Sequence, residues 1–502
     1  MEFTLSNRAK KITFGLMGLG LIVMIIGFFS QKEYLHPEVI DKNTLMVSYH
    51  HEVDVLEVDA LKQNLKDKAA AHNVEITIED AHSHAEGEEH HAHHGFEWLI
   101  VAKETVSEHE SFTEHEHKHT AAQVVEHILH SGEVALKDHH YKRFWSNLMV
   151  NGFFFFGISL GALFFLALIY ATETGWAVVV KRLFEAVMMA LPFGAIILLI
   201  VFATGSLHLH HIFHWMDSDL YVEGGEHYDA LIAGKAAYLN QPFFWFRTLV
   251  YLAVFILFAR GFRKRSILED EVGGTDIHFM NYRKGATFLV LFAVFSTTLA
   301  WDWIMSIDTH WFSTLFGWYT FSGIWISGML TVLFLALYLR RKGLMPNIND
   351  SHIHDLGKWV FAVSFLWSYL WFSQFMLIWY SNIPEETTYF ITRIEEYRWL
   401  FFGVFAVNFI LPMLFLMSRE SKRAYGVLTT VGAIIFIGHW LDVFLMIMPG
   451  TVFGHWTIGL LEIGMFMMFF GAFVFIVLTN LSKAPLMPKH HPYLEESLHH
   501  EI

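Results

Sequence analysis

Long apolar runs separated by short polar segments dominate the chain. A helix needs about 20 mostly apolar residues to cross the roughly 30 Å hydrocarbon layer of a membrane. Ten runs meet this need, at about 12–30, 145–170, 184–206, 243–260, 286–307, 312–340, 357–381, 398–418, 425–448 and 456–480. Several are apolar on every side, as expected for helices that contact both lipid and other helices. The pattern predicts an all-α polytopic membrane protein with about ten transmembrane helices.

Cationic side chains favour one orientation of these spans. Loops rich in Lys and Arg stay on the cytoplasmic side of a membrane. With the N-terminus inside, 20 of these residues fall on the cytoplasmic side, and four fall outside: Lys235, Arg247, Arg393 and Arg398. Residues 1–30 have no small-x-small cleavage pattern, so we expect a retained anchor helix and not a signal peptide. We expect a multi-pass inner (cytoplasmic) membrane protein with both termini in the cytoplasm.

One long polar segment, residues 31–144, interrupts the apolar pattern. It holds 23 acidic and 10 basic residues, and therefore −13 of the total charge of −15. Alternating residues predict strands near 45–47, 74–78 and 98–101, and residues 58–71 are typical of a helix. We expect a small α+β insertion on the periplasmic side.

Histidine is concentrated in the same segment, which carries 18 of the 33 histidines. Such tracts can collect divalent metal ions, but no fixed ligand spacing such as His-Glu-x-x-His occurs. The alternative is a solvated acidic excursion, and we assign no metal site to it. The densest part contains His82, His84, His90, His91, His93 and His94.

Composition excludes several classes of protein. Hydrophobic residues make up 54% of the 502, and charged residues only 17%, against about 25% in soluble domains. An acidic chain with scattered cations is a poor binder of nucleic acid. The chain has no cysteine, which excludes disulfides, iron–sulfur clusters and covalent haem attachment. We expect no redox cofactor in this chain.

A few ionisable residues fall inside the predicted spans. Each costs roughly 2.5 to 3.5 kcal/mol to insert, so each is a functional candidate by default. Asp302 lies in the fifth span, His439 and Asp442 in the ninth, and Glu462 in the tenth. We interpret them as candidates for a proton path or a quinol site. The alternative is that they are satisfied structural groups that fix helix packing.

Spacing refines these candidates. His439 and Asp442 are three residues apart, so on a helix they share a face and can hydrogen-bond. Gln374 in the seventh span and Asn408 in the eighth extend a polar line. Glu185 lies near the inner face, where the alternative to a proton-path role is a surface ion pair with the adjacent Lys181 and Arg182.

The sequence disfavours two types of cofactor site. Among the histidines near spans only His439 lies well inside one, so a haem held by two histidines is disfavoured. The aromatic run 153–156 is interpreted as packing and not as a cofactor site.

The run from 301 to 314, WDWIMSIDTHWFST, is the most specific motif. Together with the ten spans and the outer insertion, it resembles the ActF family, the second of the NrfD-like (polysulfide-reductase-type) membrane subunits of bacterial alternative complex III. The resemblance covers the membrane part, about four-fifths of the chain. It does not cover the His-rich insertion.

The resemblance implies a non-haem subunit of a respiratory quinol:cytochrome c oxidoreductase. Partner subunits would carry the electrons: multihaem and monohaem cytochromes with haem c, and an iron–sulfur subunit. The paralogous NrfD-like subunit ActC is the better candidate for the quinol site. The implied fold has two four-helix bundles, residues 145–310 and 311–450, with a peripheral first helix and a last helix and cytoplasmic tail in 451–502.

Three functions follow as alternatives. The first is a scaffold with a proton-translocation route coupled to quinol oxidation, and the second is the quinol-binding subunit itself. The third, a divalent-cation transporter, is prompted by the His-rich segment. It is disfavoured because transporters gather ligands at broken helices near the midplane, whereas here only Pro192 and Pro412 lie inside spans.

Overall fold

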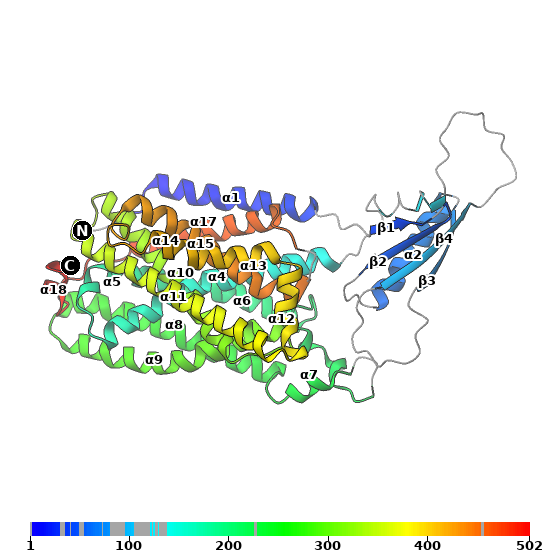
Figure 1. Cartoon of the computed structure of the whole chain (residues 1–502). Coiled ribbons are helices and arrows are strands. Elements are labelled where there is room, and N and C mark those ends of the chain that lie inside the picture. The colour runs from blue at the N-terminus through cyan, green and yellow to red at the C-terminus, as the bar shows by residue number, and fades with distance from the viewer. Residues whose placement is uncertain are drawn as a thin grey trace. The chain divides into compact units, whose positions relative to one another are not determined.

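The chain folds into two units that we describe separately. The computed structural model describes residues 3–30, 36–40, 42–49, 55–72, 74–80, 96–104, 121–122, 124–125, 129, 138–224, 228–452 and 456–501. One unit consists of Met1–Phe28 and Lys142–Ile502, and the other of Phe29–Tyr141. We call them the helical unit and the inserted unit (Figure 1). The boundaries of the inserted unit are close to those expected for the insertion, 31–144.

Ten spans in the described part of the chain are long and apolar enough to cross a membrane. They are Asn7–Ser30, Lys142–Ala171, Trp176–Ser206, Gln241–Val272, Asp276–Ile307, Leu315–Arg341, Asp350–Ser381, Arg398–Phe415, Tyr425–Val452 and Leu460–Leu481. Each corresponds to one predicted run. The predicted fold class, an all-α polytopic membrane protein, is confirmed.

The helical unit contains α-helices joined by short 3₁₀ and π turns. The α-helices are α1 (Asn7–Ser30), α4 (Asp138–Ala171), α5 (Lys181–Met188), α6 (Leu191–Ser206), α7 (Ala230–Lys235), α8 (Gln241–Val272), α9 (Asp276–Trp303), α10 (Leu315–Arg341), α11 (Asp350–Ser381), α12 (Pro384–Glu395), α13 (Arg398–Phe405), α14 (Leu411–Phe415), α15 (Tyr425–Ile447), α16 (Pro449–Val452), α17 (Leu460–Leu481) and α18 (Leu494–Leu498). The 3₁₀ turns are η1 (Trp176–Val180), η2 (His214–Met216), η3 (Ser218–Tyr221) and η4 (Met305–Ile307), and η5 (Ala406–Ile410) is a π turn.

Local sequence explains where the long helices begin and end. Asn240 caps α8 by accepting a hydrogen bond from the backbone N–H of Phe243 at 3.0 Å, and Asn349 caps α11 in the same way. Short polar side chains are preferred at this position because they satisfy unpaired N–H groups. Gly273 directly follows the last residue of α8, and its φ of +69° is a conformation that suits glycine.

The third and eighth spans are interrupted in their interior, whereas the fifth and ninth each end in a short extra turn, η4 and α16. The third span consists of η1, α5 and α6, and Pro192 lies in the first turn of α6, where its missing N–H costs nothing. The eighth span consists of α13, the π turn η5 and α14, with Pro412 directly after the turn. Proline and π turns both interrupt the regular helical hydrogen bonds.

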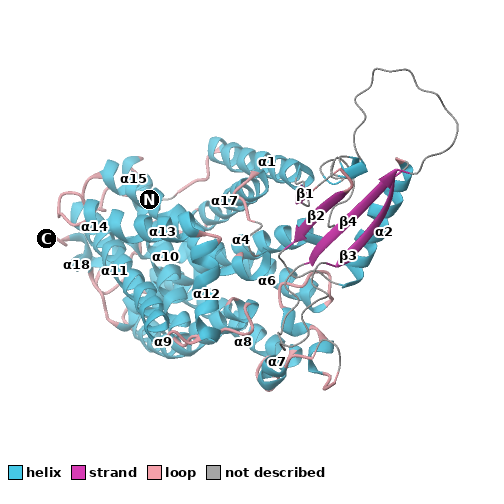
Figure 2. Cartoon of the chain, turned by 45° about the vertical axis from the view of Figure 1, so that its right-hand side comes forward, coloured by secondary structure: helices cyan, strands magenta, loops and turns pink. Residues whose placement is uncertain are grey.

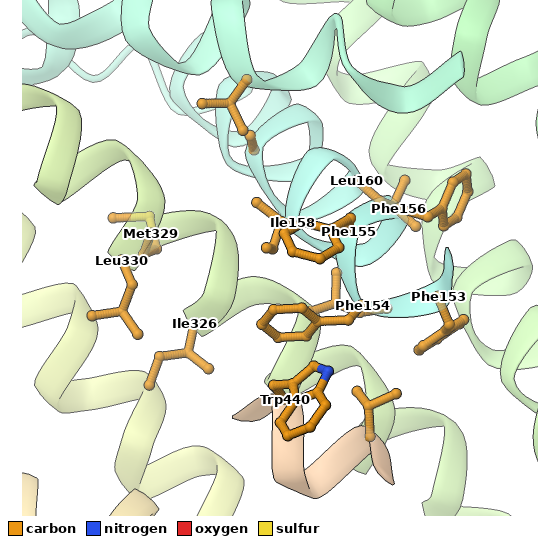
Figure 3. Packing of buried hydrophobic residues seen from close by; sticks show 14 of the residues in the cluster. Phe153, Phe154, Phe155, Phe156, Ile158, Leu160, Ile326, Met329, Leu330 and Trp440 are labelled. Carbon is orange, nitrogen blue, oxygen red and sulfur yellow. The ribbon is translucent and has the colours of Figure 1, made fainter. Parts of the chain in front are cut away.

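Helices α4, α10 and α15 form the interior of the helical unit. The most apolar stretches of their spans are 89%, 72% and 78% buried, against 17% for α1. Residues Phe153 to Phe156 of α4 are almost fully buried (Figure 3). Phe154 is in ring contact with Phe436 of α15, Phe155 with Phe469 of α17, and Phe156 with Trp303 of α9. Their interpretation as packing residues is confirmed.

Helix α1 packs along α17 at the edge of the unit (Figure 1). A Cβ atom on Gly20 would lie 2.7 Å from the carbonyl oxygen of Gly464, and one on Gly464 would lie 2.3 Å from the backbone nitrogen of Met24. Such close backbone contact through small residues is how helices associate in a membrane.

In its described residues, the inserted unit has a four-stranded antiparallel sheet and a helix, and residues 121–122, 124–125 and 129 are also helical (Figure 2). The strands β1 (His36–Val39), β2 (Thr44–Tyr49), β3 (Val74–Asp80) and β4 (Phe96–Glu104) are arranged in the order β1-β2-β4-β3, and α2 spans Val55–Ala71. The three strands and the helix expected from the sequence are present, and β1 was not expected. The histidines from His82 to His94 lie outside the described residues.

Candidate functional site

Buried polar groups cluster near both ends of the helical unit. Both chain termini lie at one end, which we call the terminal end (Figure 1). Helices α9 and α15 run from the terminal end to the opposite end, so Asp302 and Asp442, near their last residues, lie toward the opposite end. Glu462 is in the first turn of α17, which begins there.

Asp442 of α15 is held by residues of two neighbouring helices. Its carboxylate accepts a hydrogen bond from the hydroxyl of Tyr319 on α10 and another, 2.8 Å long, from the indole N–H of Trp367 on α11. The residue is 1% exposed. Within the described residues no Lys or Arg pairs with this carboxylate. A carboxylate bound only by uncharged donors can gain or lose a proton without breaking an ion pair.

His439 lies beside Asp442 but does not hydrogen-bond to it. Nδ1 of His439 is 3.9 Å from Oδ2 of Asp442, beyond hydrogen-bond range, so the direct bond that the spacing allowed does not form. Neither ring nitrogen of this buried imidazole has a partner among the described residues. Both residues instead line a cavity of about 10 Å³, shared with Thr320, Gly323 and Ser327. That is about the room one water molecule needs.

The polar line suggested by Gln374 and Asn408 is only partly assembled. Asn408 lies in the π turn η5, and a Cβ atom on Gly438 would be 2.1 Å from its Oδ1. The amide therefore presses against α15 next to His439, and both its polar atoms lack partners within the described chain. Gln374 is also buried, with Nε2 unpartnered, but it does not line the cavity.

Asp302 has a cationic partner, Arg247, which the predicted topology places on the outer side of the membrane. Arg247 of α8 makes two hydrogen bonds to it, Nε to Oδ2 at 2.7 Å and Nη2 to Oδ1 at 2.8 Å. The hydroxyl of Tyr251 adds a third at 3.0 Å. Paired hydrogen bonds of this kind fix geometry as well as charge. Asp302 is therefore an anchor between α8 and α9.

Glu462 is paired in the same manner. Arg143, in the first turns of α4, donates from Nε to Oε1 at 2.7 Å and from Nη2 to Oε2 at 2.8 Å. The amide of Asn147 and the backbone N–H of Gly459 also donate to this carboxylate. Glu462 thus joins α4 to the beginning of α17, and its lone pairs are occupied.

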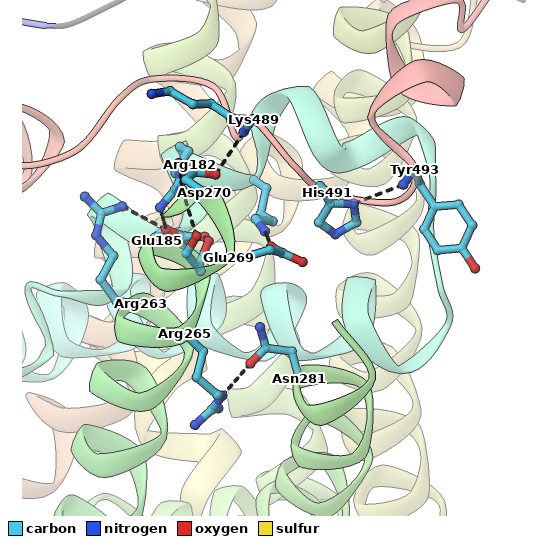
Figure 4. A network of polar contacts seen from close by, with 12 residues as sticks. Arg182, Glu185, Arg263, Arg265, Glu269, Asp270, Asn281, Lys489, His491 and Tyr493 are labelled. Carbon is cyan, nitrogen blue, oxygen red and sulfur yellow. Dashed lines mark hydrogen bonds and ion pairs between the residues drawn. The ribbon is translucent and has the colours of Figure 1, made fainter. Parts of the chain in front are cut away.

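At the terminal end, Glu185 belongs to a buried ionic network (Figure 4). Arg182 and Arg263 donate to its Oε2 at 3.0 and 2.9 Å, and Ser266 donates to Oε1. The alternative of an ion pair involving Arg182 was correct, but its placement at the surface was wrong, because Glu185 is 0% exposed. Lys181 pairs instead with Glu269 at 3.1 Å.

Two imidazoles adjoin this network. His278 of α9 and His491 of the C-terminal segment contact each other, with ring centroids 4.9 Å apart. Both nitrogens of His278, Nε2 of His491 and Oε1 of Glu269 are buried without a hydrogen-bond partner in the described residues. Burial, reinforced by the charge of Lys181, lowers the pKa of His491 to about 2. This imidazole is neutral at physiological pH.

Most partners in these clusters could not be found from the sequence. Arg143, Arg247 and Arg263 resemble ordinary positive-inside or helix-end cations, and Tyr319 and Trp367 are two of many aromatic residues. The only available signal was an ionisable group within an apolar run. That signal identified the carboxylates and not what neutralises them.

The chain was compared with known proteins. No protein-family model matches it, and no curated protein sequence matches it.

Proposed function

We propose that this chain is a non-haem integral membrane subunit of a respiratory quinol:cytochrome c oxidoreductase of the alternative complex III type. The motif at residues 301–314 and the lack of cysteine support this role. In the complex, the chain would contact the NrfD-like paralogue, the cytochromes and the iron–sulfur subunit, which carry the electrons. The terminal end would face the cytoplasm, because most Lys and Arg residues outside the insertion belong to that side in the predicted topology.

The proposed activity is a proton route coupled to quinol oxidation. The observation that carries it is the Asp442 cluster: a buried carboxylate with uncharged donors, beside an imidazole with two unpartnered nitrogens, around a cavity for one water molecule. Carboxylates, imidazoles and water are the groups that relay protons inside membranes. Asp302 and Glu462, fixed by guanidinium groups, act as helix anchors and not as relays.

The test follows quinol-driven cytochrome c reduction and proton release by the purified complex. Asp442→Asn should retain electron transfer and lose most proton release. Gly323→Ala makes a sharper test, because its methyl carbon would lie 3.7 Å from both Asp442 Oδ2 and His439 Nδ1. It fits without a clash but occupies part of the cavity. It should also reduce proton release.

Gly403→Ala is the matched control, because a Cβ atom there meets nothing within 4 Å. It should behave as the wild type. Normal proton release in an assembled complex carrying Asp442→Asn would refute the proton route and leave the subunit as a scaffold.

Quinol binding is the second candidate function, and a groove favours it. The groove, about 730 Å³, lies between α10 and α11 and is lined mainly by Trp318, Tyr369, Phe372 and Met376. This volume is typical of small-molecule pockets, and an apolar aromatic wall suits an isoprenoid chain. A photoreactive quinone should label residues 315–318 or 369–377 if this candidate is correct, and labelling confined to other subunits would reject it.

A further inference from the structure

The loop after α6 brings three histidines to one carboxylate. His208, His211, His214 and Asp217 follow one another at intervals of three residues. Their Nδ1 atoms lie 3.0, 3.3 and 3.6 Å from the carboxylate oxygens of Asp217. All three imidazoles are about half exposed, and Asp217 is one-quarter exposed. The cluster is therefore open to ions in solution.

The intervening residues hold this loop in place. His210 turns back into the helical unit, where its Nε2 lies 3.0 Å from the carbonyl oxygen of Val201, and Phe213 and Trp215 are buried. His208 has a φ of +54° just after the end of α6. Glycine is the usual residue in that conformation. A histidine there places its imidazole beside Asp217.

The spacing of these groups fits a tetrahedral metal site. Zinc binds imidazole nitrogen and carboxylate oxygen at about 2.0–2.2 Å, which separates neighbouring tetrahedral ligands by roughly 3.3 Å. The three measured distances, 3.0 to 3.6 Å, bracket that value. Ligand atoms of His208, His211 and Asp217 all lie within 4.8 Å of one another. His214, whose Nδ1 lies 3.6 Å from Oδ2 of Asp217, is the fourth and most distant group.

Electrostatics also favours a cation here. In the described part of the chain, the side-chain partners of the Asp217 carboxylate are imidazoles, with no Lys or Arg among them. A second group, Glu269 with two histidines, is less suitable, because the ammonium of Lys181 already neutralises its carboxylate through Oε2.

We propose that His208, His211, His214 and Asp217 form a binding site for one Zn²⁺-like divalent metal ion. Imidazole nitrogen is a ligand that suits zinc, copper, nickel and iron ions. A bound ion would join the C-terminal end of α6 to the segment that leads into η3. It would thereby fix the loop between α6 and α7. This site is separate from the proposed proton route and does not depend on it.

Histidine footprinting tests the site in the full-length protein without any substitution. Diethyl pyrocarbonate modifies accessible imidazoles, and mass spectrometry reports each histidine separately. With zinc chloride present, modification of His208, His211 and His214 should fall at least about tenfold. His310 is the internal control, because it is equally exposed but pairs with one carboxylate, Asp229. Its reactivity should change little.

Substitution then identifies the ligands. Asp217→Asn should weaken zinc protection of the three histidines by at least about tenfold, and Asp229→Asn should leave it unchanged. Because the readout is residue-specific, zinc bound by the His-rich insertion does not interfere. Unchanged reactivity of the three histidines in the wild type at saturating zinc, or equal protection of His310, would overturn the proposal.

Discussion

Buried carboxylates of the helical unit differ in what neutralises them. Asp302 and Glu462 each face a guanidinium that donates two hydrogen bonds, whereas Asp442 faces a phenol and an indole. Breaking a buried ion pair leaves an uncompensated charge, which is strongly destabilising. A carboxylate whose hydrogen-bond donors are neutral has no charged partner, so no cation is left uncompensated when the carboxylate gains a proton. A buried carboxylate therefore serves as an anchor at two positions and as a candidate proton carrier at the third.

Removing only one member of the Arg247–Asp302 ion pair should strongly reduce the stability of the helical unit. Arg247→Met should destabilise the helical unit by about 3–5 kcal/mol, because it strands a buried carboxylate. Adding Asp302→Leu to it should recover much of that loss. Unfolding in mixed micelles measures both variants. Arg340→Gln is the control: its pair with Asp350 is exposed, so it should cost less than about 1 kcal/mol. Equal losses in the single and double variants would contradict the anchor role.

At the scale of helices, the sequence predicts well where a helix forms but poorly which helices become neighbours. A run of about 20 apolar residues has no stable alternative to a helix in lipid, so all ten spans were foreseeable. Asp302 and Arg247 are 55 residues apart, and Glu462 and Arg143 are 319 apart. Such pairings depend on which helices become neighbours, and local periodicity does not carry that information. The inner Glu185 network was placed at the surface for the same reason.

Glycine contacts should decide whether α1 stays against α17. In Gly464→Leu the new side chain would meet the backbone of α1 at Met24, so α1 should separate from α17. Phe14 and Phe475 are in ring contact across this pair, at 4.9 Å. Since the chain has no cysteine, cysteines at these two positions report the contact by bifunctional cross-linking. Gly18→Leu, with nothing within 4 Å, should cross-link normally, and normal cross-linking in Gly464→Leu would refute the contact.

The C-terminal segment should loosen in acid through His491. Burial lowers the pKa of this imidazole to about 2, whereas an unfolded histidine titrates near 6.5. The released segment therefore binds a proton that the docked segment does not, and docking weakens by about 1.4 kcal/mol for each pH unit below 6.5. Stability is retained above that pH and lost on acidification.

Hydrogen exchange of residues 484–501, corrected for the intrinsic effect of pH, measures this linkage. Between pH 7 and 5 opening should increase roughly 30-fold. His491→Gln should flatten the dependence, while the exposed neighbour His490 can be changed to Gln with the wild-type slope retained. A wild-type slope in His491→Gln would assign the effect to another group.

At the scale of the whole molecule, the orientation of the helical unit decides which buried cluster lies near which face of the membrane. Proton uptake and release need groups that reach opposite faces of the membrane. The Asp442 cluster lies toward the end opposite the termini, and the Glu185 network lies at the terminal end. The Lys and Arg asymmetry predicts that the terminal end faces the cytoplasm. The proton route and the proposed metal site both depend on this assignment for their physiological side.

Cysteine labelling tests the orientation directly, since the natural chain contains no cysteine to block. Ser218 is exposed in η3 at the end opposite the termini, and Ser418 is exposed in the loop after α14. A membrane-impermeant maleimide should label Ser218→Cys in intact cells or spheroplasts, and label Ser418→Cys only after the membrane is opened. The reverse pattern would place the termini outside and invert the direction of the proton route. Labelling of both positions in sealed cells would contradict the ten-span topology, because five spans, an odd number, separate these two loops and place them on opposite sides.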